Sequence, residues 1–589
     1  MNEWMIFVGI VLAAIVLLGI QGQRERKKQR ALARKRIREE YGAAPMENRD
    51  RDEAAVEGSF LHAEKDFFLD DITWNDLDME LVFRRMNYAR CSAGAEELYR
   101  MLRCPVMEEK LLRERNILAD CMAERGALRE QLSLMLYEIG FTGKYALEDY
   151  LDYLDNLGHR SNLRHILMDL SFVPGIALLF VSPAMGAVII FMVLVINIMT
   201  YFKEKGEVNP YLVSFAYILR MIRGAEKVKG VLDKACRDGS LKAGIPGAEE
   251  IFVRYREILE KDTKELGSFR SFSQVAMSMS NPVGGSGPFD ILFDYLKMSL
   301  HLDLMKFNQM LQIVRQKDGV VRELVSALGT LDACICIAYY RASLEEFCRP
   351  DFDRERGVAA EALYHPLLEN PVKNSIHTER GVLITGSNAS GKSTFLKTVA
   401  LGAVLAQTIC SVPAGSWAAP FYRVMSSMAL RDSLTGGDSY FMVEIKALKR
   451  ILDACGGGVR AEDSRLAAGD DAPAPVLCFV DEVLRGTNTV ERIAASSRIL
   501  QSLTGCEILC FAATHDIELT HLLEEYYENY HFEETIEDGD ISFNYLLKKG
   551  RAQSRNAIRL LEVMGYDRRV VQEAEALAER FLESGEWKV

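Results

Sequence analysis

The chain lacks paired cysteines in the arrangement that most zinc sites use. Its 12 cysteines are scattered over 589 residues, and none of them forms a C-x-x-C pair. Cys334 and Cys336, the closest upstream pair, fall within an apolar helical pattern. We therefore expect reduced core cysteines in a cytosolic protein body, and neither a zinc site nor another metal cluster.

An excess of positive charge is also absent, because the formal net charge is −13. A protein whose whole surface coats nucleic acid carries the opposite sign, so the composition argues against that class. A negative net charge is still compatible with a local track of basic residues that contacts nucleic acid. The length is sufficient for roughly three to four domains with ample core.

A glycine-rich loop is the clearest chemical signal that is present. The sequence GSNASGKS at residues 386–393 follows the apolar stretch 382–384 and precedes a helical pattern. In this strand–loop–helix context, backbone N–H groups and the helix N-terminus cradle phosphates, the lysine reaches the β- and γ-phosphates, and the serine hydroxyl binds Mg²⁺. The loop predicts ATP and Mg²⁺ as ligands of Gly386, Ser387, Asn388, Ala389, Ser390, Gly391, Lys392, Ser393 and Thr394.

Two further apolar runs end in polar side chains that suit the same chemistry. The run 476–480 reads as a buried parallel strand and leads into Asp481 and Glu482. Asp481 suits Mg²⁺ binding, and Glu482 suits the general base that polarises the attacking water. A second run, 508–513, ends next to His515, whose imidazole suits a hydrogen bond to the γ-phosphate or the water. We expect the three strand ends to build one site at the carboxyl edge of a parallel sheet.

These motifs together resemble the ATPase motifs of the MutS family. The resemblance is carried by the segments 386–394, 439–444, 481–489 and 513–520, in this order, and by His365-Pro366 ahead of the first strand. It implies an ABC-type P-loop ATPase domain of α/β fold at the C-terminus, preceded by an all-α MutS-like core and lever region. The resemblance is close over about 200 residues and is less specific in the helical region that precedes them.

The family resemblance also implies that two subunits complete each site. Ser439 would approach the γ-phosphate bound by the partner subunit, and residues 486–489 would lie along the seam of a homodimer. Leu484 stands where the family has a glycine, which puts the turn at this position in question. No aromatic residue that stacks on adenine can be placed, because Val372 and Lys373 occupy the region where one is expected.

The first residues of the chain predict a membrane anchor. Residues 4–20 are uncharged and apolar, and residues 24–38 contain nine Lys and Arg against one Glu. Because the charges follow the apolar run, a signal anchor with its basic side in the cytoplasm fits better than a cleaved signal peptide. Contact of the basic segment with anionic lipid of the inner leaflet is favoured over contact with nucleic acid.

A second apolar stretch, 170–202, is uncharged over 33 residues and has basic residues at both ends. The basic segment 24–38 and the ATP site must both face the cytoplasm, so this stretch must return to the side on which it starts. We expect a short membrane hairpin that turns at Ser182-Pro183; a buried core hairpin is the alternative.

The resulting domain prediction has seven parts. They are an N-terminal transmembrane anchor at 1–22, a basic juxtamembrane segment and linker at 23–60, a helical MutS-core-like part at 61–163, the membrane hairpin at 164–205, a second helical core and lever part at 206–350, the ATPase domain at 351–548 with a surface insertion at 456–475, and a helical dimerisation tail at 549–589. The protein is expected at the cell membrane, with the helical and ATPase domains in the cytoplasm.

The segments present leave the biological task open. A MutS protein of mismatch repair begins with a mismatch-reading domain and a connector domain, and residues 1–60 resemble neither, so wedge-type recognition of a mispair is not expected. A modest basic helix face for DNA is offered by Arg220, Arg223, Lys227, Lys229 and Lys234, although ordinary solvated charge is the favoured interpretation.

Three functions follow from these patterns. The first is a membrane-anchored dimeric MutS-like ATPase that acts on DNA, related to mismatch repair. The second is a membrane scaffold whose nucleotide state controls a protein partner, and the sequence does not separate these two. A transporter ATPase is disfavoured, because too few membrane spans are present and the sequence GGDSY at 436–440 replaces the transporter signature Leu-Ser-Gly-Gly-Gln.

Overall fold

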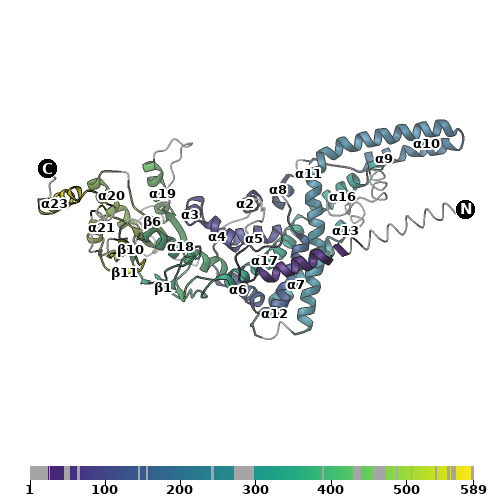
Figure 1. Cartoon of the computed structure of the whole chain (residues 1–589). Coiled ribbons are helices and arrows are strands. Elements are labelled where there is room, and N and C mark those ends of the chain that lie inside the picture. Colours follow the sequence, from purple (N-terminus) through teal and green to yellow (C-terminus); the bar gives the residue numbers. More distant parts are fainter. Residues whose placement is uncertain are drawn as a thin grey trace, which may run out of the picture. The chain divides into compact units, whose positions relative to one another are not determined.

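The chain, as a computed structural model, forms two compact units (Figure 1). The first unit comprises residues 1–64, 86–100 and 114–343, and the second comprises residues 65–85, 101–113 and 344–589. The residues that the structure describes are 21, 24–25, 27–45, 53–62, 67–142, 146–153, 157–239, 244–270, 298–387, 390–428, 440–455, 473–485, 487–505, 507–537, 540–552, 558, 561 and 565–584. All but residue 21 of the predicted anchor at 1–22 and most of the predicted insertion at 456–475 lie outside this set.

The second unit is built on a six-stranded sheet of strand order β11-β8-β3-β7-β6-β5. Neighbouring strands are parallel except at the edge, where β11 pairs antiparallel with β8. The strands are β3 (Gly381–Thr385), β5 (Arg423–Ser427), β6 (Val476–Asp481), β7 (Ile508–Ala513), β8 (Tyr527–His531) and β11 (Lys548–Lys549). The apolar runs at 476–480 and 508–513 are therefore buried parallel strands, as the sequence predicts.

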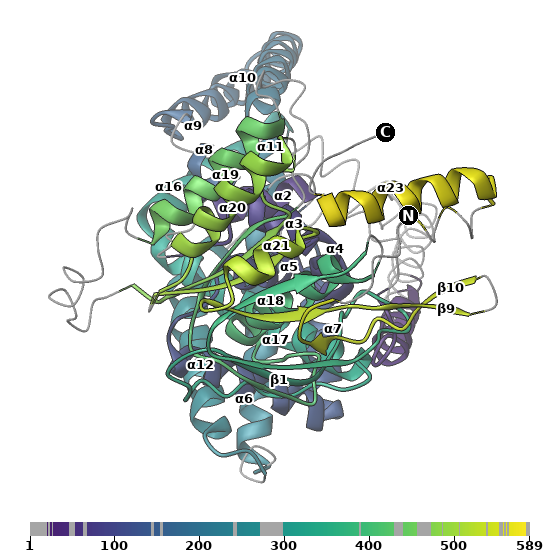
Figure 2. The same ribbon diagram turned by 90° about the vertical axis from the view of Figure 1, so that its left-hand side faces the viewer.

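Helices cover both faces of this sheet (Figure 2). On one face, α18 (Lys392–Ile409) packs against β6 and β7, and its other side contacts β1 (Val358–Leu363) of a small antiparallel sheet. The small sheet also contains β2 (Asn374–Thr378) and β4 (Ser416–Ala418). On the other face, one apolar cluster joins the strands to α19 (Tyr440–Ala454), α20 (Thr489–Ser502) and α21 (Ile517–Leu522). The helices pack against the two faces of the sheet, and polar side chains lie at the carboxyl ends of the strands.

Two segments that precede the ATPase motifs in the sequence fold with this second unit. The sequence assigned 61–163 to one helical segment, but α3 (Asp71–Asp76) packs against β5. The Asp76 carboxylate accepts hydrogen bonds from the Ser426 hydroxyl at 2.7 Å and from the Met428 N–H at 2.9 Å. Helix periodicity alone cannot reveal such contacts, because they join residues about 350 positions apart.

The first unit is helical and is organised around α17 (Asp318–Ser343), which is buried for most of its length. Against α17 pack α7 (Gly126–Ile139), α11 (Pro183–Arg237), α12 (Ala248–Glu265) and α16 (Leu302–Gln316). Within the predicted core and lever part at 206–350, the stretch 302–343 forms two helices, because α16 ends before Lys317 and α17 begins after it. Further helices that lie wholly or partly in this unit are α2 (Glu53–His62), α5 (Ser92–Arg103), α6 (Glu109–Glu124), α8 (Leu147–Tyr153) and α13 (Gly267–Arg270). Helix α4 (Met79–Met86) belongs to the second unit up to residue 85.

The basic segment that follows the predicted anchor is helical over 27–39 and lies against α7. Arg38 donates two hydrogen bonds to Glu130, at 2.6 and 3.1 Å, and Arg30 forms an ion pair with Glu138 at 2.5 Å. Ala33 and Ile37 are buried in a small apolar cluster with Leu134 of α7. Part of the positive charge that the sequence analysis assigned to lipid is therefore engaged by acidic residues of the protein.

A helical hairpin projects from the first unit (Figure 1). The chain passes through α9 (Leu163–Leu170) and α10 (Phe172–Leu179), reverses before Pro183, and returns along the start of α11. The backbones approach closely at glycines: a Cβ atom at Gly186 would lie 2.9 Å from the carbonyl oxygen of Gly175. The predicted boundary at residue 205 falls inside α11, which continues without interruption into the helical core.

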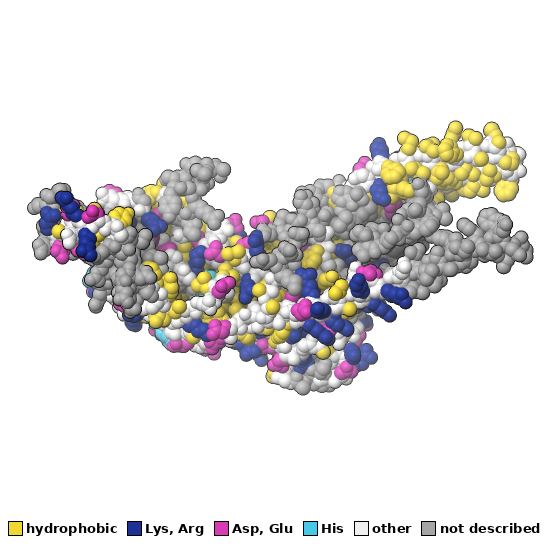
Figure 3. Space-filling model, in the orientation of Figure 1, with side chains coloured by type: hydrophobic (Ala, Val, Ile, Leu, Met, Phe, Trp, Pro, Cys, Tyr) yellow, Lys and Arg dark blue, Asp and Glu magenta, His cyan; other side chains and the backbone are white. Residues whose placement is uncertain are grey.

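The outer surface of the hairpin is apolar (Figure 3). Phe180 and Val181 at its tip are 89% and 82% exposed. Within the described residues, one helix is long and apolar enough to cross a membrane by length and composition, Pro183–Val208, with a mean hydropathy of 2.3. Other exposed apolar side chains of the hairpin are Leu163, Leu167, Leu170, Val173, Ile176, Met185, Val188, Phe191, Met192, Ile196, Met199 and Phe202.

The basic face considered for DNA is largely engaged within the first unit. Lys227 pairs with Glu138 at 2.5 Å, and Lys229 lies 3.6 Å from Glu260. Arg220 donates a hydrogen bond to the carbonyl oxygen of Phe141 at 2.9 Å. Three of the five positive charges therefore have partners inside the unit, which weakens the case for a phosphate-binding track there.

Candidate active site

The phosphate-loop sequence lies between β3 and α18, at the carboxyl end of the central strand. Gly386 and Gly391 have φ angles of +145° and +105°, and a Cβ atom at Gly386 would lie 2.9 Å from the carbonyl oxygen of Phe532, so the path requires glycine there. Asn388 and Ala389 lie outside the described residues. The Lys392 ammonium donates hydrogen bonds to the carbonyl oxygens of Gly386 at 2.8 Å and Ser387 at 2.7 Å. Burial lowers the pKa of Lys392, and nearby acids oppose this.

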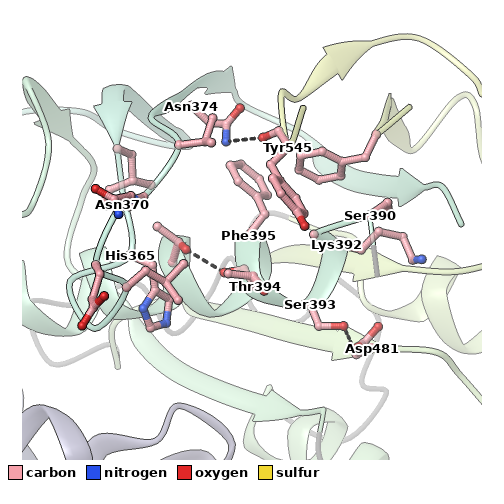
Figure 4. Close-up of a pocket in the computed structure, with 18 of the residues that line it drawn as sticks. His365, Asn370, Asn374, Ser390, Lys392, Ser393, Thr394, Phe395, Asp481 and Tyr545 are labelled. Carbon is pink, nitrogen blue, oxygen red and sulfur yellow. Dashed lines mark hydrogen bonds between the residues drawn. The ribbon is translucent and has the colours of Figure 1, made fainter. Parts of the chain in front are cut away.

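Ser393 and Asp481 form the second part of the site, and Figure 4 shows them side by side. The Ser393 hydroxyl donates to Oδ2 of Asp481 at 2.5 Å. The other oxygen, Oδ1, is buried and has no hydrogen-bond partner among the described residues. Burial raises the pKa of Asp481, while the Ser393 hydrogen bond and the Lys392 charge lower it. A buried carboxylate oxygen without a partner, beside a hydroxyl, suits a hard divalent cation such as Mg²⁺.

Glu482 and His515 meet at the ends of the neighbouring strands β6 and β7. His515 Nε2 lies 2.7 Å from Oε1 of Glu482, and Arg485 forms an ion pair with the other carboxylate oxygen. Burial raises the pKa of Glu482, but the hydrogen bond and charge of His515 and the charge of Arg485 outweigh it, so the pKa lies below its usual value. Glu482 is therefore held ionised, which is the state that a general base requires.

The backbone that carries Glu482 is strained. Glu482 and Leu484 have φ angles of +56° and +58°, in the left-handed region that costs a non-glycine residue roughly 1–2 kcal/mol. The turn thus keeps a conformation suited to glycine although leucine occupies position 484. The Glu482 N–H donates to the carbonyl oxygen of Ala513 at 2.9 Å, and the Ser496 hydroxyl donates to that of Val483 at 3.1 Å.

A cavity of about 600 Å³ adjoins these groups. Figure 4 shows the Tyr545 ring beside Phe395 on one side of it. Asn374 fixes the backbone there by donating to the Tyr545 carbonyl oxygen at 3.0 Å. The residues that line the cavity are Leu363, His365, Leu368, Glu369, Asn370, Pro371, Val372, Asn374, Ser390, Gly391, Lys392, Ser393, Thr394, Phe395, Thr398, Asp481, Glu482, Arg485, Phe532 and Tyr545.

The structure brings together most of the side chains that the sequence proposed. Lys392, Ser393, Thr394, Asp481 and Glu482 line one cavity, and His515 contacts it through Glu482. Ser439 lies outside the described residues. Sequence reasoning missed Tyr545 and Asn374: one follows an edge strand and the other opens a short strand, and neither position has a recognisable spacing from the phosphate loop. The available signal was the aromatic content of 541–545, at the end of strand β10 (Asp540–Phe543).

The fold and the site define the second unit as an α/β domain whose charged groups converge at the carboxyl ends of parallel strands. Residues 382–582 match the family model MutS domain V. The chain is 31% identical over 289 residues to the DNA mismatch repair protein MutS of Natronomonas pharaonis, an alignment that covers 47% of this chain and 31% of that protein.

Similar relatives occur in bacteria. The DNA mismatch repair protein MutS of Lactobacillus delbrueckii subsp. bulgaricus is 28% identical over 311 residues, covering 50% of this chain and 34% of that protein. The DNA mismatch repair protein MutS of Thermotoga maritima is 30% identical over 286 residues, covering 46% of this chain and 33% of that protein. The chain thus spans about a third of the length of the curated relatives it matches, and the similarity supports a relationship to the MutS family.

Proposed function

We propose that the protein is an ATP hydrolase of the MutS type. The observation that carries the proposal is the convergence of Lys392, the Ser393–Asp481 pair and the Glu482–His515 pair on one cavity. A cation, two acids of different environment and a histidine meet there at a helix N-terminus, which is the set of groups that phosphoryl transfer to water requires. The match of 382–582 to MutS domain V supports the same assignment.

Each side chain has a distinct part in this scheme. The Lys392 ammonium, which now donates to two loop carbonyls, would turn to the β- and γ-phosphates of ATP. Ser393 and Asp481 would hold Mg²⁺, which neutralises charge on the phosphate oxygens when bound. Glu482 orients and polarises the attacking water, and His515 keeps the Glu482 carboxylate ionised and fixed.

Tyr545 is the best candidate for contact with the adenine base. Its ring lines the cavity wall near Phe395, and the backbone around it is held by Asn374. An aromatic ring and a base stack favourably through their π-faces. His365, in the same lining, is buried, which lowers its pKa to about 4, so it is neutral at physiological pH and adds no charge beside the base.

A second copy of the chain would complete each site. By the family resemblance, Ser439 would approach the partner's γ-phosphate, and the exposed Arg485 lines the cavity that holds the proposed site. The tail helix α23 (Arg568–Ser584), which the sequence proposed as a dimerisation element, carries the half-exposed apolar Val570. Homodimerisation would couple ATP binding and hydrolysis to movement of the helical unit.

Membrane attachment is the second component of the proposal. The limb formed by α9 and α10, residues 163–179, has 17 residues, or about 26 Å. Because Arg164, His165 and Asp169 lie in α9, its uncharged part begins at Leu170 and is shorter than the roughly 30 Å of a bilayer's hydrocarbon core. Its apolar outer surface and the Lys and Arg residues at its base, seen in Figure 3, suit insertion from the inner leaflet, with both units in the cytoplasm. The apolar run 4–20 supplies the other proposed attachment.

The target of the proposed ATPase has two candidates. The MutS relationship favours DNA, whereas the internal pairing of Lys227, Lys229 and Arg220 favours a protein partner. Binding of the purified protein to duplex and branched DNA, with and without ATP, separates them. Affinity that falls steeply with salt indicates phosphate contacts and DNA, and no binding at low salt supports the scaffold function.

The activity itself is tested by measuring phosphate release from ATP and the binding of a fluorescent ATP analogue. The wild-type protein should hydrolyse ATP only with Mg²⁺, and Lys392→Ala should lose affinity for the analogue. Equal binding by Lys392→Ala and the wild type would contradict the assignment of the phosphate loop.

A further inference from the structure

Glu444 is a buried acid with no part in the proposed binding and hydrolysis of ATP. It lies in the first turns of α19, is 3% exposed, and belongs to the segment 439–444. Burial raises the pKa of Glu444, and the backbone N–H groups of Leu484 and Arg485 lower it. Burial of a carboxyl group costs free energy unless the group is hydrogen-bonded. The contacts of the Glu444 carboxyl group therefore indicate its role.

The contact of Glu444 is with the strained backbone after β6. Its Oε1 atom accepts a hydrogen bond from the Leu484 N–H, at the residue whose φ angle is +58°. The second oxygen, Oε2, is buried without a hydrogen-bond partner among the described residues. A leucine in the left-handed region is strained and persists only where surrounding contacts stabilise that conformation. The hydrogen bond from the Leu484 N–H to Glu444 is such a contact.

Glu482 and Arg485 lie on either side of Leu484, and both reach the cavity. Displacement of the Leu484 backbone would move the carboxylate of Glu482 away from His515 and would release its ion pair with Arg485. Among the described residues, the Leu484 N–H donates to Glu444, whereas Lys392 donates to the carbonyl oxygens of residues 386 and 387. The Glu444 contact is therefore closer to the water-activating group than to the phosphate loop, and we expect it to affect turnover more than nucleotide binding.

We propose that Glu444 is a positioning residue that holds the Glu482 turn in its left-handed conformation, an inference that rests on the proposed ATP hydrolysis. Helix α19 begins directly after Ser439, the residue that the family resemblance directs at the partner's nucleotide. A shift of α19 caused by the partner's ATP would be transmitted through Glu444 to Glu482.

A matched pair of substitutions tests the tether. Glu444→Gln keeps an oxygen that accepts from the Leu484 N–H, and Glu444→Met fills a similar volume without a comparable acceptor. In the full chain, Glu444→Met should lower kcat about tenfold, equivalent to about 1.4 kcal/mol, with KM for ATP nearly unchanged. Glu444→Gln should retain most of the wild-type kcat. Equal kcat values in the two variants, or a rise in KM that matches the fall in kcat, would overturn the proposal.

Leu484→Gly supplies a rescue, because glycine adopts the left-handed conformation without strain. Because Leu484 also belongs to the buried apolar cluster, Leu484→Gly is measured alone as the reference. Adding Glu444→Met to Leu484→Gly should lower kcat much less than adding it to the wild type. An equal loss of kcat on the two backgrounds would contradict the proposed role of the hydrogen bond.

Hydrogen exchange separates failure of this inference from failure of the proposed function. Amides of 483–485 should exchange about tenfold faster in Glu444→Met than in Glu444→Gln, whether or not the wild type hydrolyses ATP. Equal exchange in the two variants rejects the tether. Absence of turnover in a wild-type protein that shows this difference rejects the ATPase assignment and leaves the tether standing.

Discussion

His515 Nε2 lies 2.7 Å from the Glu482 carboxylate, and this contact joins the ends of β7 and β6. The two strands are neighbours in the sheet, with Asp481 opposite Ala513 in the register. The pairing of the strands therefore brings the histidine to the acid, although 33 positions separate them in the sequence. The position of the proposed general base thus depends on the sheet as much as on the turn that carries it.

Removal of His515 should change the pH dependence of hydrolysis. Burial raises the pKa of Glu482, and the hydrogen bond from His515 is the largest effect that lowers it. His515→Ala should therefore raise that pKa, so that ionised Glu482 is lost at a higher pH and the acidic limb of the kcat profile moves upward. His521→Ala, at an exposed histidine of α21, is the control. An unmoved acidic limb in His515→Ala would contradict the contact's proposed role.

Tyr545 should contribute to nucleotide affinity through its ring. Tyr545→Ala should raise KM for ATP about tenfold, since stacking between a base and an aromatic side chain is worth about 1–3 kcal/mol. Tyr545→Phe keeps the ring and should stay close to the wild type. The measurement is the KM for ATP of the wild type and the two variants by steady-state kinetics. Equal KM values for the alanine and phenylalanine variants would contradict the assignment of Tyr545 to the adenine base.

Asp262 in α12 should make stability depend on pH. It is fully buried, neither carboxylate oxygen accepts a hydrogen bond among the described residues, and burial together with the neighbouring Glu323 carboxylate raises its pKa to about 7. Because this lies above the usual value, folding binds a proton at acidic pH, and the stabilisation is lost as pH rises from about 4 to about 7.

Asp262→Asn removes this effect. The melting temperature of the variant should exceed that of the wild type by several degrees at pH 8, since roughly 1 kcal/mol shifts it by about 2–4 °C. The difference should shrink as pH falls to 4.5. A variant that is less stable than the wild type at pH 8 would show that the Asp262 carboxylate has a partner.

The tip of the hairpin should contact hydrocarbon. Phe180→Trp places an indole at the most exposed apolar position of the tip, and brominated acyl chains in anionic vesicles should quench its added fluorescence. Leu81→Trp, at a half-exposed residue of α4, provides the control. Equal quenching of the two added indoles would remove the support for membrane insertion of the hairpin.

Much of the α/β fold follows from local sequence. The stretches at 382–384, 476–480 and 508–513 are apolar runs of strand length, and strands buried on both faces need such runs. The phosphate loop and the acids after β6 were identifiable because each directly follows a predicted strand. The reversal of the hairpin before Pro183 was predictable for a similar reason, since a proline suits the first turn of a helix.

Other parts of the site depend on contacts between distant segments. Nothing near Glu444 in the sequence indicates that its carboxylate meets the Leu484 N–H, 40 positions away. Tyr545 lines the cavity, and its backbone is held there by Asn374, 171 positions away in the sequence. Likewise, composition cannot show whether the basic residues at 27–39 contact lipid or protein, and Arg30 and Arg38 have acidic partners on α7.

The most direct test of the account is a single substitution, Glu482→Gln, measured for both nucleotide binding and turnover. The amide cannot act as a base, so kcat should fall at least about a hundredfold while ATP and Mg²⁺ remain bound at wild-type affinity. Glu525→Gln, an exposed acid of the same unit, should behave like the wild type. Unchanged hydrolysis by Glu482→Gln would contradict the central claim that water is activated where β6 ends.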